Sequence, residues 1–407
     1  MKLAVLFDNL GPYHVARLRA VAQRCNLLAV EQRAASTEYA WEATTQVPFR
    51  RVTLFGKGST RRSVSPAGVP HAVHAALAEF GPDAIAVPGW ATSMATSAVA
   101  WASLRGVPAS LMSDSQEIDF ERTTLREWVK RRFVSNCGGA IVGGTPHREY
   151  LVKLGMDPSR IRLGYDVVDN EHFRRGAVQA REHVAVLRKQ MGLPAHYFLT
   201  VTRFIEKKNL PRLLQAFAMF LAATARDRTD AEPWYLVVLG DGELRPLLEK
   251  QVNSLGLSDR VLMPGFKQYP ELPTWYALAE AFVLASTTEQ WGLVVNEAMA
   301  SGLPVLVSNR CGCAVDLVRS GANGHTFDPH DVACLAGLMA QIAEDPVQLR
   351  TMGKASAALI DAWSPAVFAD NLFGLTKELT ALPVRRPTLM DRAVLNLMLA
   401  RHRAGAL

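Results

Sequence analysis

Short apolar runs alternate with segments of helical length along the chain. In the first half the apolar runs fall at residues 3–7, 27–30, 83–87, 109–112, 140–142 and 161–164. The pattern restarts at residues 198–202 and continues at 235–239, 261–263, 281–284 and 304–307. Strands that alternate with helices build mostly parallel sheets covered by helices. The pattern therefore predicts two α/β domains.

The predicted domain boundary lies near residue 190, because residues 169–194 are polar and charged and lack a strand-like run. We expect an N-terminal Rossmann-like domain at residues 1–190 and a C-terminal one at residues 191–365. The two would face each other across a cleft. Residues 366–407 are expected to form a helical segment with a basic tail that returns to the first domain.

Composition narrows the class of protein. The chain has 407 residues, about half of them apolar, which is enough for two cores. The apolar run at the start of the sequence is too short for the hydrophobic region of a signal peptide, and no apolar run elsewhere approaches the length of a membrane span. Five scattered cysteines do not resemble a disulfide framework. These features predict a cytoplasmic protein. The net charge of +7 suits anionic lipid, nucleic acid or a phosphorylated ligand, but no nucleic-acid recognition motif accompanies it.

The loop after the first predicted strand carries Gly11, Pro12 and His14. Ligands of open α/β sheets bind beyond the carboxyl ends of the strands, and helix N-termini favour anions. Gly11 would let the backbone approach a donor, and His14 could titrate near neutrality or bond a hydroxyl. An ordinary turn with a capping histidine explains the same residues.

The second half offers further loops of this kind. Arg203 and Lys208 follow the strand at 198–202, where they could neutralise a phosphate. Gly240-Asp241-Gly242 reads as a plain turn. Phe266 follows another strand and could support a nucleobase, or belong to the core.

Glu289 and Glu297 stand eight positions apart around an apolar run that opens at Gly292. Glu289 is expected in the loop after a strand, and residues 292–301 as a helix stopped by Gly302 and Pro304. The helix start then seats an anion between two carboxylates. Sugar, diphosphate and ribose of a nucleotide sugar have this layout, although incidental glutamates on a surface helix fit the pattern as well.

Other chemistries lack their motifs. The sequence has no Asp-x-Asp pair, no zinc spacing around Cys311-Gly-Cys313, no Walker A motif and no Gly-x-Ser-x-Gly elbow. We therefore expect a site without a metal or other cofactor, in which Arg203 and Lys208 neutralise the leaving diphosphate.

Together the loops resemble the retaining glycosyltransferases of family 4, which have the two-domain GT-B fold. The most specific likeness is Glu289-Gln-Trp-Gly-Leu-Val-Val-Asn-Glu297-Ala-Met-Ala, which is similar to the family's Glu-x7-Glu motif. The resemblance implies transfer of a sugar from a nucleotide sugar, with catalytic roles for Arg203, Lys208 and Glu289. In this assignment Glu289 would hold the hydroxyls of the donor sugar. The resemblance assigns the ribose to Glu297 and the base to the loop at Phe266. It assigns sugar and phosphate to the backbone of four residues, Trp291, Gly292, Leu293 and Val294.

Two departures from the family pattern concern specificity. Many relatives have a histidine where this chain has Met112-Ser113-Asp114, so the acceptor-side contact is open, with His14 and Asp114 as candidates. The family's Gly-Gly-x-x-Glu stretch appears here as Cys311-Gly312-Cys313-Ala-Val-Asp316. In retaining members the departing phosphate oxygen takes the acceptor proton, so no strong protein base is required.

The acceptor is expected to be a saccharide, and a lipid-linked one in bacterial surface polysaccharide or glycolipid assembly. Basic and apolar residues mix in a predicted loop at residues 49–62, in a basic segment at 126–133 and in the tail at 388–402. This mixture suits an anionic membrane surface and peripheral binding to its inner face. The alternatives are a sugar-nucleotide epimerase or hydrolase of the same fold, and a non-catalytic nucleotide-sugar-binding protein. Base, sugar and oligomeric state cannot be read from the sequence.

Overall fold

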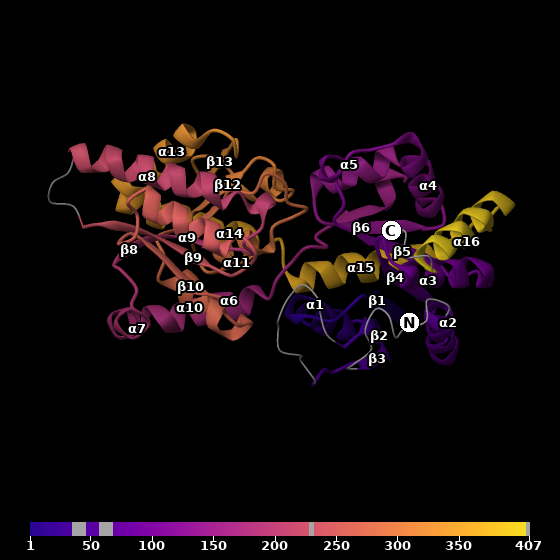
Figure 1. Ribbon diagram of the computed structural model, residues 1–407. Helices are drawn as coiled ribbons and strands as arrows, with labels where there is room; N and C mark the ends of the chain where they lie inside the picture. Colours follow the sequence, from indigo (N-terminus) through magenta and orange to yellow (C-terminus); the bar gives the residue numbers. More distant parts are fainter. Residues whose placement is uncertain (35–45, 57–67, 228–231, 404–407) are drawn as a thin grey trace. The chain divides into compact units, whose positions relative to one another are not determined.

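The computed structural model describes residues 1–34, 46–56, 68–227 and 232–403. The chain forms two compact units (Figure 1). Unit 1 comprises Met1–Val167 and Ser364–Leu407, and unit 2 comprises Val168–Trp363. The units therefore divide at Val167 and not near residue 190, and the chain returns to unit 1 after Trp363, in line with the expected return of the tail.

Unit 1 is built on a parallel sheet of seven described strands in the order β3-β2-β1-β4-β5-β6-β7. Its strands are β1 Lys2–Phe7, β2 Asn26–Arg33, β3 Arg50–Phe55, β4 Ala84–Pro88, β5 Ala109–Ser113, β6 Gly139–Val142 and β7 Ile161–Leu163. Its helices are α1 Pro12–Ala22, α2 Gly68–Phe80, α3 Ser93–Arg105, α4 Thr124–Val134, α5 Thr145–Lys153, α15 Pro365–Thr380 and α16 Leu389–Arg403, with short 3-10 turns η1 Glu117–Asp119 and η2 Pro158–Arg160.

Unit 2 repeats the design with a parallel sheet of six described strands in the order β10-β9-β8-β11-β12-β13. Its strands are β8 His196–Val201, β9 Trp234–Leu239, β10 Val261–Gly265, β11 Ala281–Leu284, β12 Val305–Ser308 and β13 Gly324–Phe327. Its helices are α6 Asn170–Arg181, α7 Val184–Met191, α8 Leu210–Asp227, α9 Arg245–Ser254, α10 Leu272–Ala277, α11 Leu293–Ala300, α12 Ala314–Leu317, α13 Val332–Glu344 and α14 Pro346–Ile360, with 3-10 turns η3 Glu206–Lys208 and η4 Tyr269–Glu271.

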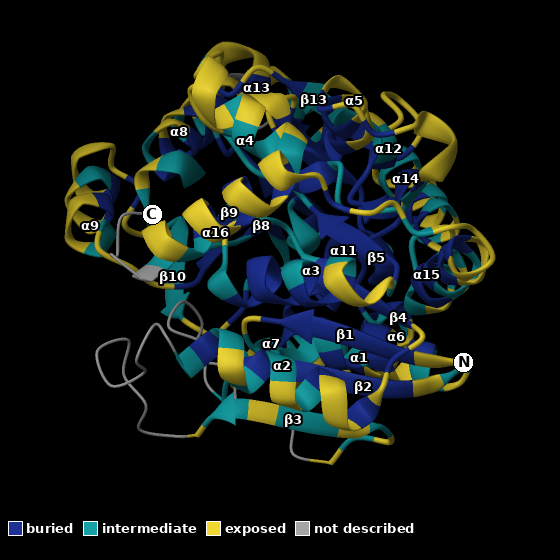
Figure 2. Ribbon diagram, turned by 90° about the vertical axis from the view of Figure 1, so that its right-hand side faces the viewer, coloured by how far each residue is buried: buried dark blue, intermediate teal, exposed yellow. Residues whose placement is uncertain are grey.

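The central strands of both sheets are buried, as their uninterrupted apolar runs predict. Figure 2 shows this for β1, β2 and β5 of unit 1. Each sheet is doubly wound, because the chain runs from β1 outward to β3 and then crosses to β4, and likewise from β8 to β10 and then to β11. Ligands of such sheets bind beyond the carboxyl ends of the strands where the order reverses. These switch points lie between β1 and β4 in unit 1 and between β8 and β11 in unit 2.

The structure corrects two expectations about the connections. Residues 169–194 were expected to be a linker, but most of them form α6 and α7. Ala177 and Ala180 of α6 are buried against Ala277, and a Cβ on Gly176 would lie 2.5 Å from Pro273. The small side chains of α6 thus let it pack closely on α10, which ties this segment to unit 2. Residues 50–55, expected as a loop, form the edge strand β3.

Candidate donor site

The loop after β8 is held in place by Asn209. This residue has φ of 57°, a left-handed conformation that asparagine tolerates better than most residues. Its Nδ2 donates to the carbonyls of Ala285 (3.0 Å) and Pro329 (2.7 Å). Thr287 N also donates to the carbonyl of Lys207 at 2.8 Å. These bonds fix the loop that carries the predicted phosphate residues next to the loop that follows β11.

Gly240 and Gly242, which the sequence analysis treated as a plain turn, allow the β9 loop to pack on the β8 loop. Their φ values are 130° and 154°. A Cβ on Gly240 would lie 1.8 Å from the carbonyl oxygen of Thr202, and one on Gly242 would lie 2.7 Å from that of Phe204. Only glycine allows so close a backbone approach at positive φ.

Glu289 and Lys208 meet at the switch point of unit 2. Lys208 Nζ donates to Glu289 Oε2, and Lys207 Nζ lies 3.8 Å from Glu289 Oε1. The side chains of Glu289 and Lys208 are 13% and 12% exposed. Glu289 was predicted to bind the donor sugar and Lys208 a phosphate, and the structure places the two side chains in direct contact. Arg203 is partly buried in the same β8 loop, two residues beyond the strand.

The backbone at Glu289 lies beside Cys311-Gly312-Cys313. Glu289 N donates to the carbonyl of Arg310 (3.3 Å), Gly312 N donates to that of Glu289 (3.0 Å), and Cys313 N donates to that of Trp291 (3.2 Å). Burial raises the pKa of the Cys311 and Cys313 thiols, which keeps them protonated and unreactive. The segment that departs from the family pattern therefore supports the loop of Glu289 through its backbone.

Helix α11 begins as predicted directly after Gly292, whose φ of 107° suits glycine. Gly292, Leu293 and Val294 are partly exposed. The first N-H groups of a helix lack partners within it and carry its partial positive charge, so this start can receive an anion. The side chain of Trp291 is buried, with Nε1 donating to Asn296 Oδ1 at 2.9 Å, so only its backbone can contact a ligand there.

Glu297 is more enclosed than the sequence suggested. It is completely buried, and the hydroxyl of Tyr276 donates to its Oε2 at 2.7 Å. Buried carboxylates require such donors. A ribose could reach Glu297 only if the surrounding side chains moved. The side chain of Glu289, by contrast, is partly exposed and can meet a ligand without such a movement. Phe266 is 40% exposed beyond the end of β10, where a planar base could stack.

His14 in unit 1 does not match the expectation that it titrates near neutrality. Its Nδ1 accepts from Gly11 N at 3.2 Å, and its ring lies 4.4 Å from that of Phe7. Burial, followed by the charge of Arg17, lowers the pKa of His14 well below its usual value. The capping alternative is therefore correct, since Gly11 is the N-cap of α1 and His14 closes the first turn.

Asp114 belongs to a group of charged residues beyond β5, β6 and β7. Burial, then the charge of Asp114, raises the pKa of Asp166 to about 8, while Arg17 opposes the shift. Burial also raises the pKa of Asp114, against the influence of His147. A Cβ on Gly143 would lie 2.8 Å from Asp166 Oδ2 and 3.1 Å from His147, so glycine leaves room for both.

Arg17, His147 and Asp166 were not predicted from the sequence to belong to a site. Asp166 lies three residues beyond β7, and His147 follows the Gly143-Gly144 turn beyond β6. The positions of Asp166 and His147 after predicted strands could have identified these two as candidates, because ligands of open α/β sheets bind beyond the carboxyl ends of the strands. Arg17 lies within α1 and gave no such signal.

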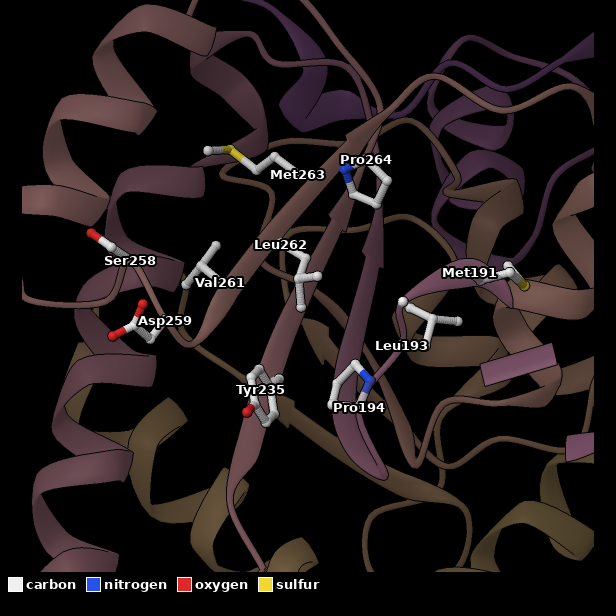
Figure 3. A pocket seen from close by; sticks show the side chains of 11 residues that line it. Met191, Leu193, Pro194, Tyr235, Ser258, Asp259, Val261, Leu262, Met263 and Pro264 are labelled. Atoms are coloured by element: carbon white, nitrogen blue, oxygen red, sulfur yellow. The ribbon is translucent and has the colours of Figure 1, made fainter. Parts of the chain in front are cut away.

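A pocket of about 570 Å³ lies elsewhere in unit 2 (Figure 3). Its lining includes Pro194, Tyr235, Leu262 and Pro264. Pro194 precedes β8, and Tyr235 stands at the start of β9, so this pocket extends to the amino-terminal ends of the strands. Arg203 and Glu289 lie beyond the carboxyl ends. Arg203, Lys208 and Glu289 are not among the residues that line this pocket.

Comparisons with known proteins agree with this fold. Residues 187–358 match the sequence model of the family described as Glycosyl transferases group 1, and the matched region contains Arg203, Lys208, Glu289 and Glu297. The chain is similar to an alpha-D-kanosaminyltransferase of Streptomyces kanamyceticus, with 29% identity over 64% of this chain and 66% of that protein. It is also similar to an alpha-monoglucosyldiacylglycerol synthase of Acholeplasma laidlawii, with 26% identity over 59% of this chain and 58% of that protein.

The sequence matches thus span about three fifths to two thirds of these relatives, whereas the structural likeness extends over almost the whole chain. Sucrose-phosphate synthase from Thermosynechococcus elongatus superposes with a TM-score of 0.72, 21% identity and coverage of 93% of this chain and 99% of that one. Anabaena Alr3699/HepE in complex with UDP and glucose gives a TM-score of 0.68, 19% identity and coverage of 94% and 100%. The two Rossmann-like domains have the GT-B fold, as the resemblance implied.

Proposed function

We propose that the protein is a retaining glycosyltransferase that needs no metal ion and moves a sugar from a nucleotide-diphosphate sugar to a hydroxyl of a saccharide acceptor. The observation that carries this proposal is the contact of Lys208 with Glu289 at the switch point of unit 2, in the loop that leads into the start of α11. A cation, a carboxylate and a helix N-terminus there match the phosphate and hydroxyl groups of such a donor.

The chemistry follows from these charges. As the bond between the anomeric carbon and the phosphate oxygen breaks, negative charge grows on the diphosphate. Arg203, Lys208 and the start of α11 stabilise that charge, which lowers the barrier because the interaction strengthens in the transition state. The acceptor hydroxyl attacks the same face of the sugar and gives its proton to the departing phosphate oxygen. Glu289 binds hydroxyls of the donor sugar, and the donor phosphate replaces Glu289 as the partner of Lys208.

A lipid-linked saccharide is the proposed acceptor. One relative is named as a synthase of a glycosylated diacylglycerol, which supports a lipid-bearing acceptor here. The solved HepE structure with UDP supports testing uridine nucleotides first, although neither comparison fixes the base of this protein's donor.

The proposal is tested by thermal denaturation with UDP-, GDP- and ADP-sugars, because a ligand that binds only the folded state raises the midpoint. The stabilising donor is then incubated with saccharide acceptors in the presence of EDTA, and the anomeric configuration of the product is measured by NMR. A product with the donor's configuration is expected. Donor consumption without acceptor would indicate an epimerase or hydrolase, and stabilisation without any turnover would indicate a binding protein. Inversion or loss of turnover in EDTA would contradict the retaining or metal-independent mechanism.

A further inference from the structure

Exposed apolar side chains gather on one part of unit 1. They come from η1 and the residue after it, from the outer face of α4 and from the start and middle of α16. Phe120 is 70% exposed, Leu125 66% and Leu389 84%. The full set, which we call the α4–α16 surface, is Ile118, Phe120, Leu125, Trp128, Leu389, Met390 and Leu397. Large apolar side chains that cluster in this way usually mark an interaction surface.

The two helices form a continuous surface. α16 packs against α3 and α4, with Val394, Leu395 and Met398 buried in the core of unit 1. The guanidinium of Arg132 lies 5.6 Å from the ring centre of Trp128, and its Nη1 lies 3.5 Å from Asp391. Asp391 directly follows Leu389 and Met390, so these contacts connect the apolar residues of α4 with those of α16. Figure 2 shows exposed residues along both helices.

Arginines surround the apolar side chains. Those exposed on or beside the two helices include Arg126, Arg131, Arg386, Arg392 and Arg401, whereas the exposed Arg385 is paired with Asp391. Several acidic residues of this region are already paired, since Glu127 contacts Lys130, Asp391 contacts Arg385 and Glu117 contacts Lys153. The surface therefore presents an excess of positive charge next to apolar groups.

We propose that the α4–α16 surface binds an anionic lipid bilayer, with its apolar side chains in the headgroup region and its arginines on lipid phosphates. Apolar residues rimmed by cations are the composition of interfacial helices, and each arginine near an anionic membrane strengthens binding. Among the described residues, no helix combines the length and the apolar character that a membrane span requires. The proposal does not depend on the donor chemistry.

Of the three segments in which the sequence mixes basic and apolar residues, the one at residues 49–62 is not part of this surface. Arg50 and Arg51, expected in an exposed loop, belong to β3. Arg50 pairs with Glu79, and Arg51 lies 2.7 Å from the buried Glu31. These arginines are engaged within the protein, whereas Arg61 and Arg62 lie outside the described residues. The predicted helical segments at 126–133 and 388–402 are helices in the structure and supply the proposed surface.

The test measures co-sedimentation of the full chain, without donor, with vesicles of phosphatidylcholine alone or mixed with phosphatidylglycerol. We expect binding to the mixed vesicles, little binding to phosphatidylcholine, and weaker binding at high salt. The triple variant F120S/L125S/L389S should lower the partition coefficient at least tenfold. The triple variant R126Q/R386Q/R392Q should do the same and remove most of the salt dependence.

Matched controls come from exposed residues of unit 2. V178S/V186S/L247S replaces apolar side chains that are 51% to 56% exposed, and K250Q/R350Q/K354Q removes the same positive charge. Both controls should bind vesicles like the unchanged protein. The proposal is overturned if the unchanged protein does not bind anionic vesicles at low salt, or if the control variants lose as much binding as the surface variants. A dimer in light scattering that the surface variants dissociate, without vesicle binding, would assign the surface to a second copy of the chain.

Discussion

Lys208 and Glu289 contact each other although 81 positions separate them in the sequence. Lys208 belongs to η3 after β8, and Glu289 to the loop after β11, so the reversal of strand order brings them together. Cys311 and Gly312 support the backbone of Glu289 from the neighbouring loop. When a donor binds, its phosphate can replace the carboxylate of Glu289 as the ion-pair partner of Lys208.

Lys208→Ala and Arg203→Ala should lower kcat far more than they weaken donor binding, because the charge that these residues offset grows in the transition state. Each is expected to raise the barrier by about 2 to 4 kcal/mol, by analogy with the removal of an oxyanion donor. Steady-state kinetics with the donor found by thermal stabilisation measures the effect. Unchanged turnover in both variants would refute the phosphate assignment.

Glu289→Gln preserves size but removes the carboxylate charge, so it should impair transfer. The variant also releases Lys208 from its ion pair, and the apparent affinity for free nucleoside diphosphate should stay the same or rise. Measuring kcat for transfer beside the Kd of the diphosphate separates the two effects. Normal transfer by Glu289→Gln would show that this carboxylate does not bind the donor sugar.

Glu297→Gln should mainly raise the donor KM, in keeping with a ribose contact. Tyr276→Phe removes the hydroxyl that donates to Glu297 and should lower the free energy of unfolding by about 1 to 3 kcal/mol. It should also raise the donor KM. Tyr197→Phe is the matched control, because the Tyr197 hydroxyl is likewise buried and donates to the carbonyl of Trp275 at 2.8 Å. Tyr197→Phe should lower the free energy of unfolding by a similar amount and leave the donor KM unchanged. Equal donor KM values in all three variants would show that Glu297 does not contribute to donor binding.

Much of the local structure of the candidate donor site could be predicted from the sequence, because it depends on local pattern. The strand that ends before Glu289, the glycine at position 292 and the helix that follows are features of one continuous segment. The burial of Glu297 could not be predicted in this way, because it depends on residues of other segments, such as Tyr276. The capping role of His14 was one of the alternatives that the sequence offered, since its bond to Gly11 is local.

In the fold, too, local pattern predicted some features, while others depend on contacts between distant segments. Periodicity located most of the strands, but residues 169–194 looked polar enough to be a linker. Their place in unit 2 depends on the fit of Gly176 and Ala177 against α10, which no single segment reveals. β3 was missed since its arginines resemble a surface loop until Glu31 and Glu79 are seen beside them.

Gly240→Ala should destabilise unit 2 and reduce donor binding, because the added Cβ would fall 1.8 Å from the Thr202 carbonyl and displace the β8 loop that carries Arg203 and Lys208. Gly337→Ala is the control. Gly337 lies within α13 with open space around its Cβ position, so alanine there should stabilise by about 0.5 to 1 kcal/mol. Thermal unfolding and donor titration of both variants check this. A Gly240→Ala protein with unchanged stability and donor affinity would mean that the loop contact does not shape the site.

The raised pKa of Asp166 predicts how stability changes with pH. Below its ordinary value of 3.8 the carboxyl is protonated in both the folded and the unfolded chain. As pH rises from about 4 toward 8, the unfolded chain loses this proton while the folded chain keeps it, so Asp166 makes folding progressively less favourable. Asp166→Asn stays neutral throughout and should gain about 1 kcal/mol or more relative to the unchanged protein between pH 5 and pH 8. Asp157 is a control with the opposite pH dependence, because it accepts hydrogen bonds from the Ser159 hydroxyl and amide, which lower its pKa. Asp157→Asn should therefore destabilise the protein at neutral pH, and this loss of stability should disappear as pH falls through the lowered pKa. Denaturant unfolding at each pH measures both, and parallel pH profiles for Asp166→Asn and the unchanged protein would show that Asp166 is ionised in the folded state.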